Sequence, residues 1–353
     1  MKVRFKCPAE FAAQKDAFGY GRVYRALSEA LANRDDLTLV GQAKDADVQV
    51  TYCQPLNTWK VFHWWGRDKH ENEILYTTWE TTQIPETWLQ PIERFRAIAT
   101  PSRWNTETLQ SCGVDKLGFV IRHGVEADKF PLIDRSFENS ESRFWPGKKF
   151  AFLWEGMAMN DRKGRRYVRE AFKRLLAIYP DIWLVEKIYP FASMDGPPDL
   201  CYTDEHITQI RRFMEFDEYL DLAASCHGFI YPSRGEAFGL MPLEKLATGM
   251  AVATTNWSGQ TEYLDDRFFW PIKFDMSEKG QDFFATVPFL NFQISPGQDS
   301  VPKVDDVFAA MKSMYENRAE WRERGIAGSK WVHENWTWRK AADDFAFACK
   351  SMT

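Results

Sequence analysis

The sequence predicts an α/β protein of two domains, each built on a parallel β-sheet. A length of 353 residues is enough for two domains. Short apolar runs alternate with segments of helical periodicity, which is typical of parallel strands joined by crossover helices. This alternation stops over residues 131–148 and then begins again. The interruption therefore divides the chain into two α/β units.

The first half contains a series of short apolar segments that predict strands. They cover residues 2–5, 37–41, 47–53, 74–79, 96–102 and 118–124. Residues 21–33 and 103–113 predict helices, and Gly113 ends the second of these because glycine tolerates the left-handed conformation that closes many helices. We expect an N-terminal domain over residues 1–130.

Residues 131–148, "PLIDRSFENSESRFWPGK", are polar, contain proline and glycine, and lack periodicity, so they predict a linker. A second domain is expected over 149–337. Its predicted strands cover 149–156, 181–190, 227–233 and 250–256, and its predicted helices cover 164–180, 217–226 and 239–249. Residues 275–303 look irregular, and the chain is helical again from Asp305.

Composition excludes some classes of function. The content of 44% hydrophobic and 27% charged residues is ordinary for a globular protein, and the net charge of −5 argues against a non-specific nucleic-acid binder. No segment reaches the roughly 18 apolar residues of a membrane span, and "MKVRFKCPAEF" lacks the apolar core of a signal peptide. The six scattered cysteines and six histidines show no metal-ligand spacing. We expect free thiols, no metal site and a cytoplasmic protein.

The segment "YPSRGEAFGLMPLEKLATG" (231–249) holds two glutamates, Glu236 and Glu244, with seven residues between them. A predicted strand ends in "YPS", a loop follows, and a helix begins. Ligands bind at such carboxyl ends of strands in open α/β sheets, and the free N–H groups of a helix start favour anions or hydroxyl-rich ligands. The alternative is that Glu236 neutralises the helix N-terminus while Glu244 lies on a solvated face.

A second candidate is the cation pair Arg162 and Lys163 in "NDRKG" (160–164). Two cations here would neutralise a diphosphate leaving group. The alternative is a solvated helix face, because Arg165, Arg166 and Arg169 follow at helical spacing.

The ordered segments resemble the retaining glycosyltransferase family 4, whose fold is GT-B: two Rossmann-like domains that face each other across a cleft. The similarity rests on the two-glutamate block of residues 231–264 and on four segments, the last of which lies inside that block. They are "GYGRVYRALSEAL" (19–31), "TPSRWNTETLQSCGV…VIRHGVEADKF" (100–130), "RKGRRYVREAF" (162–172) and "NWSGQTEYL" (256–264). The two-glutamate block is specific, and the other segments are weak individually.

The resemblance implies a role for each matched residue of the second domain. Glu244 would hold the ribose hydroxyls of a nucleotide, and Glu236 would bind hydroxyls of the donor sugar. The backbone N–H groups of Phe238, Gly239 and Leu240 would meet the sugar or the diphosphate. Many family members carry arginine six residues before the lysine that corresponds to Lys163, whereas this chain has Met157 there.

The resemblance also implies roles in the first domain. Gly19, Tyr20 and Gly21 would form a loop over the donor phosphates, or else a plain strand-to-helix turn. Glu80, after a predicted strand, would orient or act on the acceptor hydroxyl, or else cap a helix. The aromatic cluster in "VFHWWGRDKH" (61–70) suits a sugar or base, although core packing is an alternative for its tryptophans. The final helix, 338–353, would return to this domain.

The implied activity is transfer of a sugar from a UDP- or GDP-sugar to a hydroxyl acceptor, with retention of configuration. The nucleotide sugar is a co-substrate, and neither a cofactor nor a metal is expected. A saccharide is the default acceptor. A hydroxylated base in DNA is an alternative that rests on the basic segment 162–174, and a non-catalytic nucleotide-sugar-binding protein is another.

Overall fold

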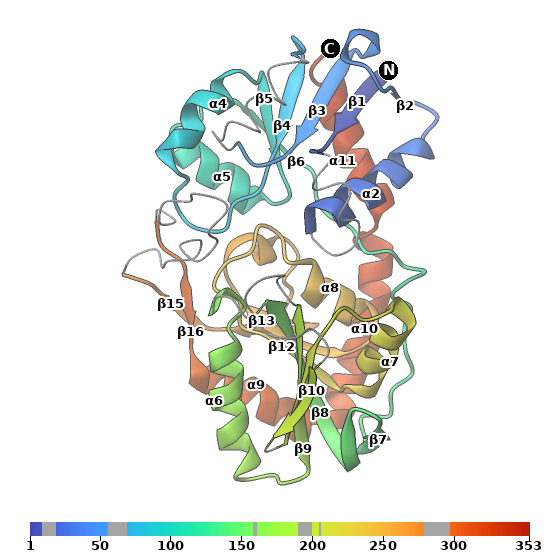
Figure 1. Cartoon of the computed structure of the whole chain (residues 1–353), viewed down its shortest axis with the longest axis vertical. Coiled ribbons are helices and arrows are strands. Elements are labelled where there is room, and N and C mark those ends of the chain that lie inside the picture. The colour runs from blue at the N-terminus through green and yellow to red at the C-terminus, as the bar shows by residue number, and fades with distance from the viewer. Residues whose placement is uncertain (9–18, 56–68, 158–160, 190–199, 205, 279–296) are drawn as a thin grey trace. The chain divides into compact units, whose positions relative to one another are not determined.

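Two separate sheets contain most strands of the chain. The computed structural model describes residues 1–8, 19–55, 69–157, 161–189, 200–204, 206–278 and 297–353. The chain divides into two units (Figure 1). Unit 1 comprises Met1–Glu126, Ser295–Gly297 and Asn335–Thr353, and unit 2 comprises Ala127–Ile294 and Gln298–Glu334.

Unit 1 is built on a six-stranded sheet in the order β2-β1-β3-β4-β5-β6, in which every pair of neighbours is parallel. Its strands are β1 (Lys2–Lys6), β2 (Thr38–Leu39), β3 (Val48–Tyr52), β4 (Glu73–Tyr76), β5 (Ala97–Thr100) and β6 (Leu117–Val120). Its helices include α2 (Gly19–Ala32), α4 (Leu89–Glu93), α5 (Arg103–Ser111) and α11 (Trp338–Lys350).

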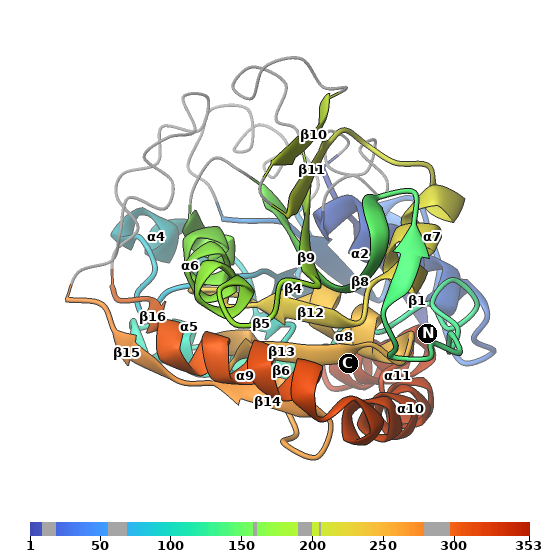
Figure 2. The ribbon, with the colours of Figure 1, turned by 90° about the horizontal axis from the view of Figure 1, so that it is seen from below.

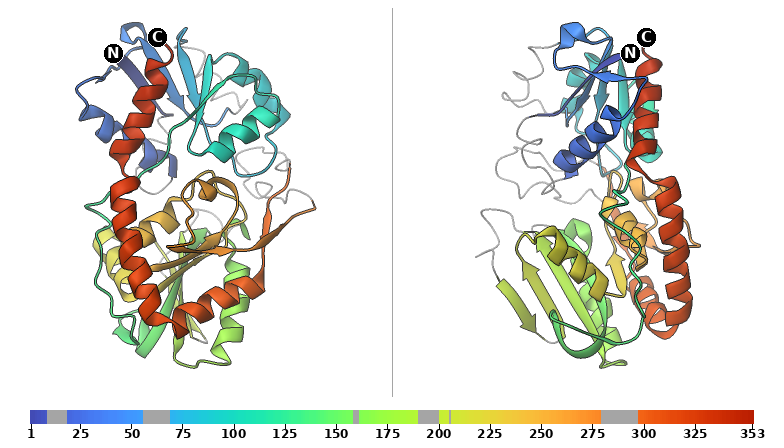
Figure 3. Two further views of the ribbon diagram at one scale, coloured as in Figure 1. Left: turned by 180° about the vertical axis from the view of Figure 1, so that it is seen from behind. Right: turned by 90° about the vertical axis from the view of Figure 1, so that its right-hand side faces the viewer.

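Helices α2 and α11 pack against each other within unit 1, although most of the chain separates them in sequence (Figure 3). The ring of Phe345 on α11 lies 5.0 Å from that of Phe5 on β1. Thr337 begins α11 as a side-chain cap that accepts a hydrogen bond from the Lys340 N–H, so the helix start is locally encoded.

Unit 2 contains an eight-stranded sheet whose main path is β10-β11-β9-β8-β12-β13-β14. Only β10 and β7 pair antiparallel with their neighbours. Its strands are β7 (Ser140–Ser142), β8 (Trp145–Met157), β9 (Ile182–Tyr189), β10 (Leu200–Asp204), β11 (Ile207–Arg211), β12 (Gly228–Tyr231), β13 (Ala251–Thr255) and β14 (Phe269–Ile272), with a ribbon of β15 (Phe274–Met276) and β16 (Ser300–Pro302).

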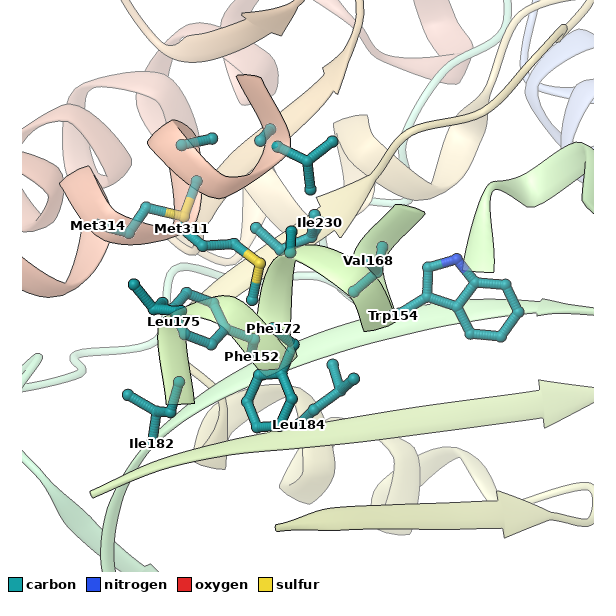
Figure 4. Packing of buried hydrophobic residues seen from close by; sticks show 14 of the residues in the cluster. Phe152, Trp154, Val168, Phe172, Leu175, Ile182, Leu184, Ile230, Met311 and Met314 are labelled. Carbon is teal, nitrogen blue, oxygen red and sulfur yellow. The ribbon is translucent and has the colours of Figure 1, made fainter. Parts of the chain in front are cut away.

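Helices cover both faces of this sheet. They are α6 (Arg165–Leu176), α7 (Phe216–Ser225), α8 (Leu240–Ala247), α9 (Val304–Glu316) and α10 (Arg318–Asn335). Helices α6 and α9 lie side by side on one face (Figure 2). Phe172 of α6 and Met311 of α9 pack with Phe152 and Leu184 of the sheet into a fully buried cluster (Figure 4). The parallel α/β class that the sequence predicts is confirmed.

The predicted linker, residues 131–148, is more ordered than its composition suggests. Strand β7 and the first residues of β8 lie inside it and form an antiparallel hairpin, so the strand predicted to begin at residue 149 begins at Trp145. Unit 2 itself begins at Ala127. The polar pattern arises because the hairpin is only partly buried, not because the segment lacks structure.

Arg135 explains how this segment is held in unit 2. This residue is 6% exposed, and its guanidinium donates hydrogen bonds to the carbonyls of Ala223 (2.8 Å), Cys226 and Thr248 (3.0 Å). These carbonyls lie at the carboxyl ends of α7 and α8, where the helix dipole favours a cation. Burial lowers the pKa of Arg135 to about 10, so the side chain stays charged at neutral pH. One arginine thus caps two helices.

We expect Arg135→Met to destabilise the protein by about 2–4 kcal/mol, because it leaves buried helix-end carbonyls without a donor. Urea denaturation measures the loss. Arg143→Met, in the same segment 131–148 but with a side chain 56% exposed, is the matched control and should cost under about 0.5 kcal/mol. Equal losses in both variants would contradict the capping role.

Candidate functional site

The order of the strands in the sheet of unit 2 reverses its direction between β8 and β12. From β8 the chain moves outward through β9 to β11, and then returns to the other side of β8 with β12 and β13. Neighbouring strands β8 and β12 therefore send their following loops in opposite directions. In open α/β sheets this reversal opens a crevice at the carboxyl ends of the strands, where ligands bind.

The loop after β8 is fixed at Lys163 and Gly164. The short helix η4 (Asp161–Lys163) ends at Gly164, whose φ of +71° favours glycine. A Cβ atom there would lie 1.9 Å from the carbonyl oxygen of Pro232, in the loop after β12. The indole Nε1 of Trp154 donates to the Lys163 carbonyl at 2.8 Å. The two loops consequently touch at the strand reversal.

The loop after β12, residues 232–239, rests on the short helix η5 (Ser258–Glu262). The Glu236 N–H donates to the Ser258 hydroxyl at 3.0 Å. A Cβ atom on Gly259 would lie 1.9 Å from the Ala237 carbonyl oxygen, so only glycine allows this approach. The Tyr263 hydroxyl donates to the Gly239 carbonyl at 2.6 Å. The loop is therefore supported along its whole length.

Glu236 lies at the centre of these loops and is 7% exposed. Its Oε1 atom accepts hydrogen bonds from Ser233 (2.8 Å) and Tyr231 (2.9 Å). The same atom accepts from Arg162 at 3.2 Å and from Lys163. The two cations predicted after β8 thus meet the glutamate predicted after β12. Glu236 pairs with these cations rather than neutralising the helix N-terminus.

The charge state of Glu236 follows from two opposing effects. Burial favours the neutral acid and raises the pKa, but the nearby charges of Lys163 and Arg162, with hydrogen bonds from Lys163 and Ser233, outweigh it. The pKa of Glu236 is therefore lowered. At neutral pH this side chain is a carboxylate, which accepts hydrogen bonds and holds no proton to give.

Helix α8 carries the other predicted donor residues. It starts after Gly239, whose φ is +83°, and no side chain caps its first N–H groups. Leu240 is its first residue, and the ring of Phe238, two residues earlier, lies 5.2 Å from that of Tyr263. Glu244 is 1% exposed, so its interpretation as a solvated residue is wrong. The uncapped helix start can accept an anion.

The arginines of α6 differ from the expected solvated face. Arg165 and Arg169 each contact a carboxylate oxygen of the fully buried Glu186 at 2.6 Å. Arg166, on the exposed side, pairs with Asp161 at 2.6 Å. The sequence pattern missed this because Glu186 is on β9, where charge was not expected. These cations are largely neutralised within the protein.

Unit 1 brings together two predicted residues that the sequence treated separately. Gly19, Tyr20 and Gly21 form the first turn of α2 rather than a loop. The Tyr20 hydroxyl lies 2.5 Å from that of Thr78, just after β4. Burial raises the pKa of Tyr20 well above its ordinary value, and the nearby charge of Glu80 adds to this. Tyr20 and Glu80 therefore belong to one polar group at the end of β4.

Several expectations concern other parts of the chain. The aromatic cluster of residues 61–68 lies outside the described residues. In the described part of the chain, no three His, Cys, Asp or Glu side chains are grouped as metal ligands. A search of the same residues finds no helix that could cross a membrane.

Sequence reasoning missed the hydroxyl groups that surround Glu236. Tyr231 and Ser233 donate to it, and Ser258 and Tyr263 hold its loop. All four lie inside segments that the sequence singled out, "YPS" and "NWSGQTEYL". Their positions were visible, but their hydrogen-bond partners depend on the fold.

Comparison with known proteins supports the fold. No protein-family model matches the chain. A "putative glycosyltransferase 45" of Sulfolobus islandicus filamentous virus is 23% identical over 220 residues, which cover 59% of this chain and 56% of the viral protein. The match thus spans about half of that relative's length.

Solved structures match over nearly the whole chain. Sucrose-phosphate synthase from Thermosynechococcus elongatus aligns with a TM-score of 0.63 at 11% identity, covering 100% of this chain and 99% of that one. A variant of TarM from S. aureus, in complex with fondaparinux, α-GlcNAc-glycerol and UDP, aligns with a TM-score of 0.59 at 8% identity, covering 92% of this chain and 58% of that one. The chain has the GT-B fold.

The pH dependence of stability tests the ion pairs of Glu236. Since its folded-state pKa lies below the ordinary 4.5, the carboxylate stabilises the protein above that pH, and the contribution is lost as the pH falls through the folded-state pKa. We expect Glu236→Gln to be less stable by about 1–3 kcal/mol at neutral pH, with the difference shrinking as the pH falls below 4.5.

Urea denaturation across this pH range measures the difference in the free energy of unfolding. Glu170→Gln, at an exposed position on α6, is the control and should show little difference at any pH. A difference for Glu236→Gln that stays constant with pH would contradict a lowered pKa.

A glycine substitution tests the contact between the two loops. We expect Gly164→Ala to cost about 2–4 kcal/mol, because the new Cβ meets a backbone carbonyl as well as adopting positive φ. Gly147→Ala is the matched control: its φ is +65° but nothing lies within 4 Å of its Cβ, so only about 1 kcal/mol is expected. Equal costs, measured by urea denaturation, would show that the loops do not touch at Gly164.

Proposed function

We propose that this protein is a GT-B glycosyltransferase that uses a nucleotide-sugar donor. The observation that carries the proposal is the buried Glu236 carboxylate, paired with Lys163 and Arg162 at the strand reversal of unit 2 and followed by the uncapped start of α8. Cations, an open helix N-terminus and a carboxylate suit the diphosphate and the hydroxyls of a sugar nucleotide. TarM, which shares the fold, was solved with UDP.

Each residue receives a role from its position. Lys163 and Arg162, with the N–H groups of Gly239 and Leu240, would bind the diphosphate. Glu236 would accept hydrogen bonds from sugar hydroxyls. Glu244, on α8, would hold the ribose, since one carboxylate accepts two O–H groups. Met157 ends β8 and brings no charge, so Lys163 and Arg162 supply the cations of this loop.

We infer transfer with retention on one face of the sugar. The bond from the anomeric carbon to the diphosphate oxygen breaks, the bond to the acceptor oxygen forms, and the acceptor proton moves to the leaving diphosphate. Glu236 is a poor nucleophile for a double displacement, because its Oε1 already accepts four hydrogen bonds. Its low pKa also makes it unsuitable as a general acid. Positioning and stabilisation of the leaving charge then supply the rate.

Acceptor, donor and cellular setting are further parts of the proposal. A UDP- or GDP-sugar is the proposed donor and a saccharide or another hydroxyl compound the acceptor, with Glu80 of unit 1 as its candidate contact. The DNA alternative loses support, because Arg165 and Arg169 pair with Glu186. No metal is required if Lys163 and Arg162 neutralise the diphosphate, and cytoplasmic location stays a prediction.

Steady-state kinetics with a panel of nucleotide sugars tests the roles. We expect Glu244→Gln to raise the donor KM about tenfold with little change in kcat, because one ribose contact is weakened. We expect Glu236→Gln to lower kcat about 100-fold, because the carboxylate stabilises developing positive charge on the sugar.

Glu170→Gln is the control and should match the wild-type protein. Wild-type kinetics in both site variants would contradict the site. Nucleotide-sugar binding without hydrolysis or transfer by the wild-type protein would favour a non-catalytic binding protein instead.

A further inference from the structure

A second buried ion pair lies in unit 2, apart from the contacts of Glu236. Glu155 of β8 and Lys245 of α8 approach to 2.7 Å between Oε1 and Nζ, and both side chains are fully buried. Glu155 alternates along β8 with Trp154, whose side chain packs in the α6 and α9 layer. The pair therefore lies on the opposite face of the sheet, towards α7 and α8.

Aromatic and hydroxyl groups complete the surroundings of this pair. The Tyr219 hydroxyl, from α7, donates to Glu155 Oε2 at 3.0 Å and accepts a hydrogen bond from Lys245. The ammonium of Lys245 lies 4.6 Å from the ring centroid of Tyr219 and 5.1 Å from that of Phe229 on β12. Two side chains of β9 also interact with Glu155: the Tyr189 hydroxyl donates to its Oε2 at 3.4 Å, and the charge of Glu155 favours the ammonium of Lys187, which donates to the Arg212 carbonyl.

Stability alone does not account for such a pair. Removing two charges from water costs several kcal/mol for each ion, and apolar side chains of similar volume are often as stable or more so. A buried pair instead fixes the geometry around it. Moving either charge away from its partner and its hydrogen bonds would leave an unpaired charge in the core, which is costly.

The position of the pair connects it to the candidate site. Glu155 stands two residues before the end of β8, whose loop carries Lys163. Lys245 follows Glu244 directly on α8. Helix α8 has only eight residues and no side-chain cap, so its own propensity fixes it weakly. A contact from β8 to α8 sets where the helix start and Glu244 lie relative to the cations.

We propose that the Glu155–Lys245 pair is a positioning device that holds α8 in register with β8, and so places the nucleotide end of the donor site. The assignment of that end rests on the proposed function. The pair itself does not touch the donor: Lys245 and Glu155 act through Glu244 and the N–H groups of Gly239 and Leu240.

The test distinguishes an effect of the pair on the position of α8 from an effect on the stability of the protein. Lys245→Met alone leaves Glu155 buried without its cation and should unfold more readily. The triple variant Glu155→Val, Tyr219→Phe, Lys245→Met replaces the ion pair and its Tyr219 link by apolar groups, while Lys187 keeps its hydrogen bond to the Arg212 carbonyl, and it should recover a urea midpoint near that of the wild type. Phe150→Leu, near the middle of β8 and in the fully buried core, is the control for general destabilisation of the same strand.

Two readouts are taken on the full chain. In the triple variant without ligand, we expect hydrogen exchange of the α8 amides to rise about tenfold, while Phe150→Leu leaves α8 no faster than the rest of unit 2. We also expect the donor KM to rise about tenfold with kcat within about twofold of the wild type.

Wild-type α8 exchange in a stable triple variant would overturn the inference, whether or not the protein transfers sugar. Faster α8 exchange with an unchanged donor KM would overturn the link to the donor site.

Absence of turnover by the wild-type protein with every donor would instead count against the proposed function. The exchange result would still decide whether the pair positions α8. A triple variant that fails to recover its urea midpoint would show that the network is needed for stability and contradict the proposal.

Discussion

The burial of one carboxylate beside two cations is the constraint on which unit 2 depends. Glu236 can stay ionised in a buried loop only because Lys163 and Arg162 lie against it. Their approach requires the loops after β8 and β12 to touch, which in turn requires glycine at position 164. The strand order brings those two loops together, so the ion pairs of Glu236 depend on the topology of the sheet.

Charge recurs on both faces of the central strands. Glu186 of β9 faces α6 and pairs with two of its arginines, whereas Glu155 of β8 faces α7 and α8. Strands in such a sheet are usually apolar on both faces because helices cover both. Here each buried carboxylate joins the sheet to a helix: Glu186 does so on the face that carries the apolar cluster of Figure 4, and Glu155 on the opposite face.

Local patterns in the sequence predicted much of this structure. The apolar runs that predict β1, β9, β12 and β13 and the Gly113 stop after α5 need only neighbouring residues, so they were predictable from the sequence. The strand β14 was not predictable, because Pro271 within it argues against a strand. The structure places β14 at the edge of the sheet, where proline is tolerated.

The site was predictable only in part. The glutamate spacing indicated where it lies, but the pairing of Glu236 with Lys163 joins residues 73 positions apart. Likewise, Arg135 looked like linker charge because its carbonyl partners lie in α7 and α8.

The most direct test of the account is a crystal structure of the protein in complex with a nucleoside diphosphate, with UDP, GDP and ADP tried in turn. The account predicts the diphosphate within hydrogen-bond distance of Lys163 Nζ and of the first N–H groups of α8, with the ribose hydroxyls on Glu244. A nucleotide bound elsewhere, with Lys163 and Glu244 making no contact to it, would contradict the account.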